Sequence, residues 1–195
     1  MAQVAQTVGP NYADYLDFEL SSPTKHEFHA GQIFAMAGGT RAHAHLCTRL
    51  SGALLSALGR RPCRPFNSEL RIFIADRDES AYPDASVICG KLGSDPRDKD
   101  AATNPSVLFE VLSPTTEKYD REGKFALYRQ IPSLRDYVLV SQEHNRVEHF
   151  ARNDDGSWTF RPLEQGEVLS LTGAPATLSI DELYQGIDDL REAVG

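Results

Sequence analysis

Apolar residues recur at steps of three and four between positions 43 and 58, and this period predicts an amphipathic helix. Thr40 can cap the first turn of this helix, and Gly59 ends it. We expect the apolar stripe of the helix to pack on a sheet. The stripe consists of His43, Leu46, Cys47, Leu50, Ala53, Leu54, Ala57 and Leu58.

Short runs that are rich in β-branched and aromatic residues, bounded by turn residues, predict strands along the chain. The run around Glu110 is otherwise almost continuously apolar, as expected for a strand that is buried on both faces. The last two runs flank a turn signal at residues 153–157 and should form a hairpin. The predicted strands cover residues 69–75, 84–89, 106–112, 136–141, 146–152 and 158–161.

Helices and a second hairpin flank these strands. Helical spacing is found at residues 11–19 and 119–130, and residues 26–36 read as a hairpin with Gly31 in its turn. Ser179 and Glu182 form a capping box that predicts a C-terminal helix. We therefore expect a single mixed α/β domain over residues 1–195. Its core should span about residues 40–141, with an N-terminal helix and hairpin in 1–39 and C-terminal strands and a helix in 142–195.

Composition narrows the function classes. The chain has 195 residues, of which 41% are hydrophobic, and a formal net charge of −8, so it is long enough for one folded core. The acidic balance argues against binding nucleic acid through bulk charge, but it allows a local basic patch or a phosphate bridged by a metal ion. The densest basic cluster is either a nucleic-acid contact or a solvated loop, and it consists of Arg60, Arg61 and Arg64. The charged runs at 76–79 and 95–100 are expected to be solvated loops.

The cysteines and the start of the chain bear on its compartment. Cys47, Cys63 and Cys89 lie far apart and form no C-x-x-C motif, so we expect free thiols rather than a disulfide or a thiolate zinc site. The N-terminal residues lack the basic and apolar regions of a secretory signal, and the apolar runs are too short to cross a bilayer. These features predict a cytoplasmic protein without a membrane segment.

Two carboxylates on successive predicted strands carry the candidate chemistry. Glu110 lies in a buried strand, where its charge needs a cation, a metal ion or hydrogen-bond donors. Asp84 begins the preceding strand, so the two carboxylates converge if these strands are neighbours. Carboxylates and water are the ligands that Mg²⁺ or Mn²⁺ prefers, and such an ion can polarise a phosphate and activate water for phosphodiester hydrolysis. Lys124 lies four residues after Asp120, with which it can pair on one helix face.

Simpler interpretations stay open for each of these residues. Asp84 could be a solvated residue at the start of a strand, and Glu110 could form a buried ion pair with Arg71 or Lys124. Glu69 and Arg71 face either the site or the solvent. His43 and His45 are two positions apart, which places them about 200° apart around a helix, so they cannot share one metal ion. His43 is therefore expected to be a packed, hydrogen-bonded histidine or to lie at the edge of the pocket.

Several motifs together resemble the Uma-type putative restriction endonuclease family, which belongs to the PD-(D/E)XK nuclease superfamily. The resemblance covers roughly residues 12–184, and the stretch from Glu110 to Thr116 (EVLSPTT) is its most specific part. The matching positions are Glu27, Gly31, residues 36–39, His43, Pro83 and Asp84, residues 110–116, Asp120, Lys124, Tyr128 and residues 134–140.

The resemblance implies a restriction-endonuclease-like core, a mixed sheet flanked by helices. It further implies that Asp84 and Glu110 bind Mg²⁺ or Mn²⁺ and that Lys124 is a displaced catalytic lysine. The plain superfamily pattern has a lysine where this chain has Leu112, a departure that family members share. Glu27 and His43 match accessory polar positions near the pocket, and a homodimer is also suggested.

The resulting prediction is a metal-dependent endonuclease that hydrolyses phosphodiester bonds in DNA. Two alternatives remain. Leu112 and the negative net charge favour a catalytically degenerate nuclease fold that serves as an interaction module. An acidic protein without a DNA-binding surface would also suit a metal-dependent phosphoesterase that acts on small phosphate esters.

Overall fold

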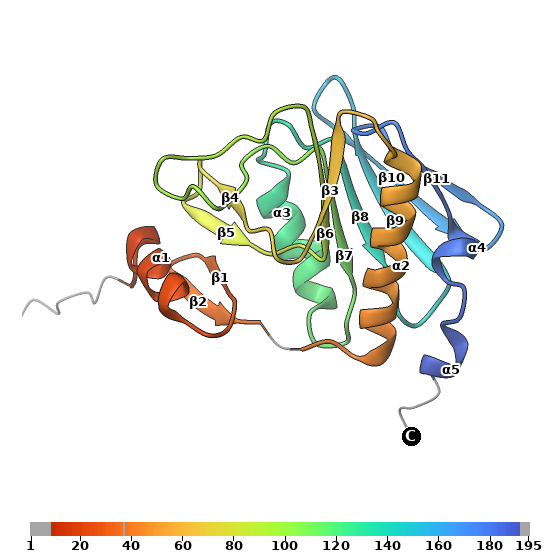
Figure 1. Cartoon of the computed structure of the whole chain (residues 1–195), viewed down its shortest axis with the longest axis horizontal. Helices are drawn as coiled ribbons and strands as arrows, with labels where there is room; N and C mark the ends of the chain where they lie inside the picture. The colour runs from red at the N-terminus through yellow and green to blue at the C-terminus, as the bar shows by residue number, and fades with distance from the viewer. Residues whose placement is uncertain (1–8, 37, 192–195) are drawn as a thin grey trace, which may run out of the picture.

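A six-stranded mixed sheet forms the centre of the computed structural model, which describes residues 9–36 and 38–191 (Figure 1). The strand order is β10-β9-β8-β7-β6-β3, in which β7 and β8 are parallel and the other neighbours are antiparallel. The predicted strand around Glu110 is confirmed as β7, and all of its residues are buried. The strands are β3 (Cys63–Asn67), β6 (Ala85–Cys89), β7 (Val107–Val111), β8 (Asp136–Val140), β9 (Arg146–Arg152) and β10 (Trp158–Glu164).

The predicted amphipathic helix is confirmed as α2 (Arg41–Leu58), which packs on one face of this sheet (Figure 1). Its stripe is fully buried at Leu46, Leu50 and Leu54, where it meets sheet residues such as Val87 and Phe109. This face carries apolar side chains at alternate strand positions, which is why one helix can cover several strands.

A π-helical turn, η1 (Tyr119–Lys124), continues into α3 (Phe125–Tyr128) on the opposite face of the sheet (Figure 1). The sequence predicted one helix over residues 119–130, and the helical part ends at Tyr128. Gly123 is required here, because a Cβ at this position would lie 2.5 Å from the ring of Tyr119. Such π turns are often found at functional sites.

A smaller sheet, ordered β2-β1-β5-β4, packs beside η1 and α3 and contains the predicted N-terminal hairpin. Helix α1 (Tyr12–Ser21) begins with a capping box at Asn11 and packs its tyrosines against Phe28 and Phe73. The hairpin thus joins strands from the middle of the chain. The strands are β1 (His26–His29), β2 (Gln32–Ala35), β4 (Ile72–Ile74) and β5 (Glu79–Ala81).

The expectation of solvated loops at 76–79 and 95–100 is wrong at two positions. Glu79 is buried in β5 beside His29, and Asp98 is buried in a bidentate ion pair with Arg71 at 2.7 and 2.8 Å. A run of charges looks solvated in a sequence, because the sequence does not show the distant partner that compensates each buried charge. The predicted strand at 69–75 is also shorter, since only residues 72–74 pair.

The predicted C-terminal helix is interrupted. Ser179 caps α4 (Ile180–Leu183) as expected, but Gly186 adopts a φ of +80° and separates it from α5 (Asp188–Arg191). The apolar face survives the break, because Leu183 and Ile187 are both buried against α2 and the sheet. A short hairpin of β11 (Val168–Ser170) and β12 (Thr177–Ser179), which the sequence pattern did not indicate, precedes α4.

The expectation of three free cysteines is also wrong. Cys63 in β3 lies opposite Cys89 in β6, and the two form a disulfide, while Cys47 keeps a free thiol. Spacing along the chain gave no sign of this pairing, because it depends on the register of two strands that lie 26 positions apart. Disulfides are uncommon in reducing compartments, so the cysteines no longer support a cytoplasmic location.

Replacing Thr40 by alanine should lower the free energy of unfolding by about 1–2 kcal/mol. The Thr40 side chain accepts a hydrogen bond from the N–H of His43 at 3.1 Å and donates one to Gln142, so the variant loses the cap of α2 and a contact to another segment. Urea denaturation measures the change. Thr48→Ala is the matched control, because Thr48 is an exposed residue inside the same helix and alanine is the better helix former. Equal stability of the two variants would contradict the prediction.

Candidate functional site

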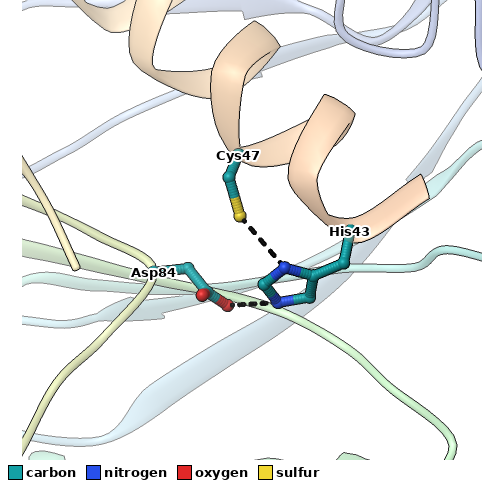
Figure 2. Close-up of side chains that lie close together, drawn as sticks. All are labelled: His43, Cys47 and Asp84. Carbon is teal, nitrogen blue, oxygen red and sulfur yellow. Dashed lines mark hydrogen bonds and ion pairs between the residues drawn. The ribbon is translucent and has the colours of Figure 1, made fainter. Parts of the chain in front are cut away.

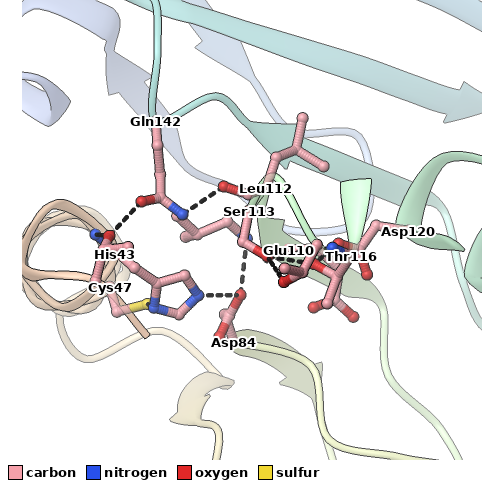
Figure 3. A network of polar contacts seen from close by, with 12 residues as sticks. His43, Cys47, Asp84, Glu110, Leu112, Ser113, Thr116, Asp120 and Gln142 are labelled. Atoms are coloured by element: carbon pink, nitrogen blue, oxygen red, sulfur yellow. Dashed lines mark hydrogen bonds and ion pairs between the residues drawn. The ribbon is translucent and has the colours of Figure 1, made fainter. Parts of the chain in front are cut away.

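Asp84 and Glu110 come together as the sequence predicted. The pairing of Ala85 with Phe109 places Asp84, one residue before β6, opposite Glu110 and on the same side of the sheet. Oδ2 of Asp84 accepts a hydrogen bond from the backbone N–H of Val111 at 2.8 Å, which fixes this carboxylate to β7 (Figure 3). Two carboxylates therefore meet where β6 begins and β7 ends.

Lys124 lies among three carboxylates. Its Nζ is 3.1 Å from Glu27, 3.1 Å from Glu110 and 3.5 Å from Asp120, and the side chain is only 8% exposed. The predicted pairing of Lys124 with Asp120 is confirmed. The π turn of η1 presents both side chains to the sheet, whereas β1 of the small sheet supplies Glu27. A helical lysine is normally solvated, whereas Lys124 is buried.

The buried charges do not balance. Among the described residues, the carboxylates Glu27, Asp84, Glu110 and Asp120 share one ammonium group and the imidazole of His43. Burial raises the pKa of Glu110 well above its usual range, against the opposing effect of Lys124, and burial likewise raises the pKa of Asp120. Burial acts to lower the pKa of Lys124, but Glu110, Glu27 and Asp120 together raise it well above normal.

This arrangement fits a divalent cation. Both contacts of Asp84 use Oδ2, and both contacts of Glu110, from Lys124 and from the hydroxyl of Tyr128, use Oε1. The second oxygen of each carboxylate is thus without a hydrogen bond within the described ranges. An ion of charge +2 would offset the excess of negative charge, and carboxylate oxygens are the ligands that Mg²⁺ and Mn²⁺ prefer. Asp84 and Glu110 are the residues that would hold such an ion.

His43 and Cys47 approach Asp84 from the first two turns of α2 (Figure 2). Nε2 of His43 is 3.3 Å from Oδ2 of Asp84, and Nδ1 is 3.5 Å from Sγ of Cys47. The hydrogen bond to Asp84 raises the pKa of His43, whereas burial and the nearby carboxylates raise that of the Cys47 thiol. A neutral thiol is a poor nucleophile, so this trio does not resemble a cysteine-hydrolase triad.

The sequence placed His43 at the pocket edge or in the core, and the structure gives it the first of these positions. The sequence prediction did not name Cys47 as a site residue. Its spacing of four residues from His43, which puts both side chains on one helix face, was the signal that could have identified it. His45 lies on another side of the helix, as expected, and contacts the carbonyl of Gln185 at 2.9 Å.

The basic cluster of Arg60, Arg61 and Arg64 lies far from this site. Arg60 and Arg61 follow the end of α2, whereas His43 lies in its first turn, and the 15 steps from His43 to Leu58, at a rise of about 1.5 Å each, separate the two ends by roughly 22 Å. Arg64 lies in β3 opposite Ile88, four residues along the chain from Asp84, or roughly 13 Å at about 3.3 Å per residue. Arg61 and Arg64 contact backbone carbonyls of Ala57 and Gly90. The structure therefore does not bring the predicted nucleic-acid contact to the carboxylates.

Glu69 and Arg71 also lie outside the site. Glu69 is exposed and pairs with Lys25 at 2.8 Å, while Arg71 is buried with Asp98 and the hydroxyl of Tyr82. Arg71 is therefore not the partner of Glu110. The open question of which cation Glu110 meets is answered by Lys124.

Two further segments close the site at the end of β7 (Figure 3). Leu112 is a buried core residue, so the place of the superfamily lysine is apolar here and the ammonium group comes from η1. Gln142 donates to the carbonyl of Leu112 and accepts from Thr40, and the hydroxyl of Thr116 donates to Asp120 at 2.7 Å. Sequence reasoning missed Gln142, which no local pattern distinguishes.

Comparison with known proteins identifies the family. The family Uma2, described as "Putative restriction endonuclease", matches residues 12–182. The chain belongs to the Uma2 family. Its relatives include two uncharacterised proteins of Synechocystis sp., one 38% identical over 89% of this chain and 90% of that protein, the other 36% identical over 86% and 96%.

The fold is shared with a solved structure. A crystal structure of a putative nuclease from Anabaena variabilis superposes with a TM-score of 0.75 at 16% identity, and covers 91% of this chain and 99% of that one. The predicted restriction-endonuclease-like fold and the Uma2 resemblance are both confirmed. The acidic cluster described above is therefore a candidate functional site in a member of the Uma2 family.

Proposed function

We propose that the protein is a metal-dependent endonuclease that hydrolyses phosphodiester bonds in DNA with Mg²⁺ or Mn²⁺. The observation that carries the proposal is the uncompensated group of buried carboxylates at the end of β7, with Asp84 and Glu110 each offering an oxygen to a cation. The Uma2 family and the nuclease with the same fold support the same class of reaction.

Each residue has a distinct role in this proposal. When bound, the divalent ion polarises the scissile phosphate and lowers the pKa of an attacking water molecule. Asp84 and Glu110 hold the ion, and the N–H of Val111 keeps Asp84 in position. Lys124 offers positive charge to the phosphate in a site from which most water is excluded. Glu27 positions Lys124, and His43 contacts the same oxygen of Asp84 as Val111 does.

A hollow of about 240 Å³ begins at Leu112 and Ser113, directly after β7, and offers a substrate an approach from that end of the strand. Its wall carries Arg121 and Arg146 together with three glutamates, and both arginines form ion pairs with Glu148. The hollow therefore adds no excess of positive charge. In this proposal the metal ion and Lys124 hold the phosphate, because a protein of net charge −8 cannot attract DNA through its whole surface.

The assembly and compartment remain predictions within the same proposal. Two observations support a homodimer. The outer strands β2 and β10 each have an edge that is open for pairing with another strand. Each also carries an exposed aromatic side chain, Phe34 on β2 and Phe160 on β10. Within residues 9–36 and 38–191, no helix combines the length and the apolar character that a bilayer crossing requires. A cytoplasmic location stays a prediction, and the Cys63–Cys89 disulfide weighs against it.

Plasmid cleavage by the purified protein tests the proposal. We expect nicking or linearisation with Mg²⁺ or Mn²⁺, none with a chelator, and loss of cleavage in Asp84→Asn and in Glu110→Gln. The matched controls are Asp76→Asn and Glu69→Gln, which remove exposed carboxylates outside the site and should cleave as the wild type does.

Three outcomes would contradict the proposal. Cleavage that survives both site substitutions would mean that the nuclease is a contaminant or uses another site. Hydrolysis of small phosphate esters without cleavage of single-stranded or double-stranded DNA would identify a phosphoesterase. No hydrolysis of either substrate by a folded protein would identify an interaction module.

A further inference from the structure

His43, Cys47 and Asp84 form a second set of possible metal ligands beside the carboxylate pair. Each offers one donor atom, and the nitrogen, sulfur and oxygen all lie within 4.8 Å of one another. Figure 2 shows the imidazole of His43 between the thiol of Cys47 and the carboxylate of Asp84, with one ring nitrogen toward each. All three are partly buried, so a bound ion would be shielded from bulk water on the side of the helix.

We propose that His43, Cys47 and Asp84 bind a thiophilic transition-metal ion, with Zn²⁺ as the expected species. Zn²⁺ is held by sulfur, nitrogen and carboxylate oxygen in four-coordinate sites, and three protein ligands leave one position for water. A thiolate selects against Mg²⁺, which takes oxygen ligands. The three donors therefore define a site with a metal preference opposite to that of the Asp84 and Glu110 pair.

The geometry needs a reorientation of the imidazole. Four ligands at about 2.0–2.3 Å from Zn²⁺ in a tetrahedron are roughly 3.3–3.8 Å apart. Cys47 lies 3.5 Å from Nδ1 of His43 and Asp84 lies 3.3 Å from Nε2, so the two short distances are to different nitrogens, only one of which can bind the ion. The three donor atoms nonetheless lie within 4.8 Å of one another, and rotation of the ring and of the Cys47 thiol brings one nitrogen, the sulfur and the oxygen around one ion.

The position on α2 supports a built site rather than an accidental cluster. A spacing of four residues on a helix places His43 and Cys47 on one face, the same arrangement by which helical histidine pairs hold zinc. Thr40 caps the helix and fixes the turn that carries His43, and Val111 fixes Asp84 through its N–H. Two of the three ligands, His43 and Asp84, are thus placed by contacts that do not depend on the metal ion.

Cobalt binding tests this site independently of any nuclease activity. The wild-type protein, freed of metal and kept without reductant so that the Cys63–Cys89 disulfide stays closed, is titrated with Co²⁺ as a spectroscopic substitute for Zn²⁺. We expect a near-ultraviolet charge-transfer band from a thiolate on cobalt that saturates at one equivalent. Cys47→Ser should abolish the band. His43→Asn should raise the dissociation constant for Co²⁺ by about tenfold or more. Loss of a residue that only supports a metal ligand already weakens metal binding by about that factor, and His43 is itself a proposed ligand.

Three controls locate the site. His45→Asn changes a histidine of the same helix that points elsewhere, and should leave the band unchanged. A Cys63→Ser/Cys89→Ser variant should keep the band, which assigns the sulfur to Cys47. Glu110→Gln should also keep it, because Glu110 belongs only to the oxygen site.

A second measurement uses the wild-type chain, so it does not depend on the folding of a variant. Zn²⁺ should displace Co²⁺ from the wild-type protein and remove the charge-transfer band, whereas an excess of Mg²⁺ should leave the band unchanged. The proposal is overturned if no charge-transfer band forms or if the band persists in Cys47→Ser. It is also overturned if Zn²⁺ leaves the band unchanged, since zinc would then bind elsewhere.

Discussion

Replacing Lys124 by methionine should lower DNA cleavage by about 10²–10³-fold and the free energy of unfolding by about 3–5 kcal/mol. The ammonium group lies within 3.5 Å of three buried carboxylates, and methionine fills the space without the charge. Like charges are then left close together in a region of low dielectric constant, and the charge offered to the phosphate is gone. Urea denaturation and initial rates of plasmid nicking measure the two effects.

The matched control for this prediction is Lys118→Met, which removes an exposed lysine one residue before η1. It should leave stability within about 0.5 kcal/mol of the wild type. If Lys124→Met does not fold, the double variant Lys124→Met/Glu110→Gln should, because it removes one of the carboxylates that the lysine compensates. Wild-type stability in Lys124→Met would show that its ion pairs contribute nothing, and full activity would remove it from the mechanism.

Mg²⁺ should stabilise the protein more at about pH 8 than at about pH 6. Burial raises the pKa values of Glu110 and Asp120 in the folded state above their unfolded values of about 4.3 and 3.9. Between the unfolded and the folded pKa values, the folded protein therefore binds more protons than the unfolded chain. The free energy of unfolding consequently falls as the pH rises through this range. The raised pKa of Lys124 has no effect on this slope, because its stabilisation is lost only above about pH 10.

A bound Mg²⁺ ion takes the place of those protons, so its stabilising effect should grow as they are lost. At a concentration one hundred times its dissociation constant, a ligand of the folded state adds about 2.7 kcal/mol. Thermal unfolding with Mg²⁺ or a chelator, across this pH range, gives the comparison. In Glu110→Gln both the pH slope and the gain from Mg²⁺ should shrink. A gain from Mg²⁺ that is the same at every pH, or that survives in Glu110→Gln, would place the ion elsewhere.

The carboxylates of the site could be predicted because each departs from its local pattern. Glu110 interrupts an apolar strand, and Asp84 begins the strand that precedes it, so strand pairing alone brings them together. Lys124 was a less secure assignment, since a helical lysine is normally solvated and only the fold shows that η1 is pressed against the sheet. Periodicity likewise gave α2 and the central strands, where one face is buried along the whole element.

Other features could not be predicted from the sequence, and most of them depend on contacts between distant segments. Arg71 and Asp98 look like ordinary surface charges until the smaller sheet brings them together, and the pairing of Cys63 with Cys89 follows from strand register. The break at Gly186 could not be read from an apolar spacing that continues across it. Short strands such as β4 and β5, with three residues each, carry too few alternations to be recognised.

In the order of synthesis, Lys124 follows the carboxylates that it compensates. Glu27 lies on β1 and Glu110 on β7, so these acids are synthesised before the ammonium group that compensates them. A translation product that stops before residue 124 carries the acids without their cation. It also lacks β8, the parallel neighbour of β7. The site can therefore assemble only late in synthesis, and incomplete chains lack the proposed catalytic centre.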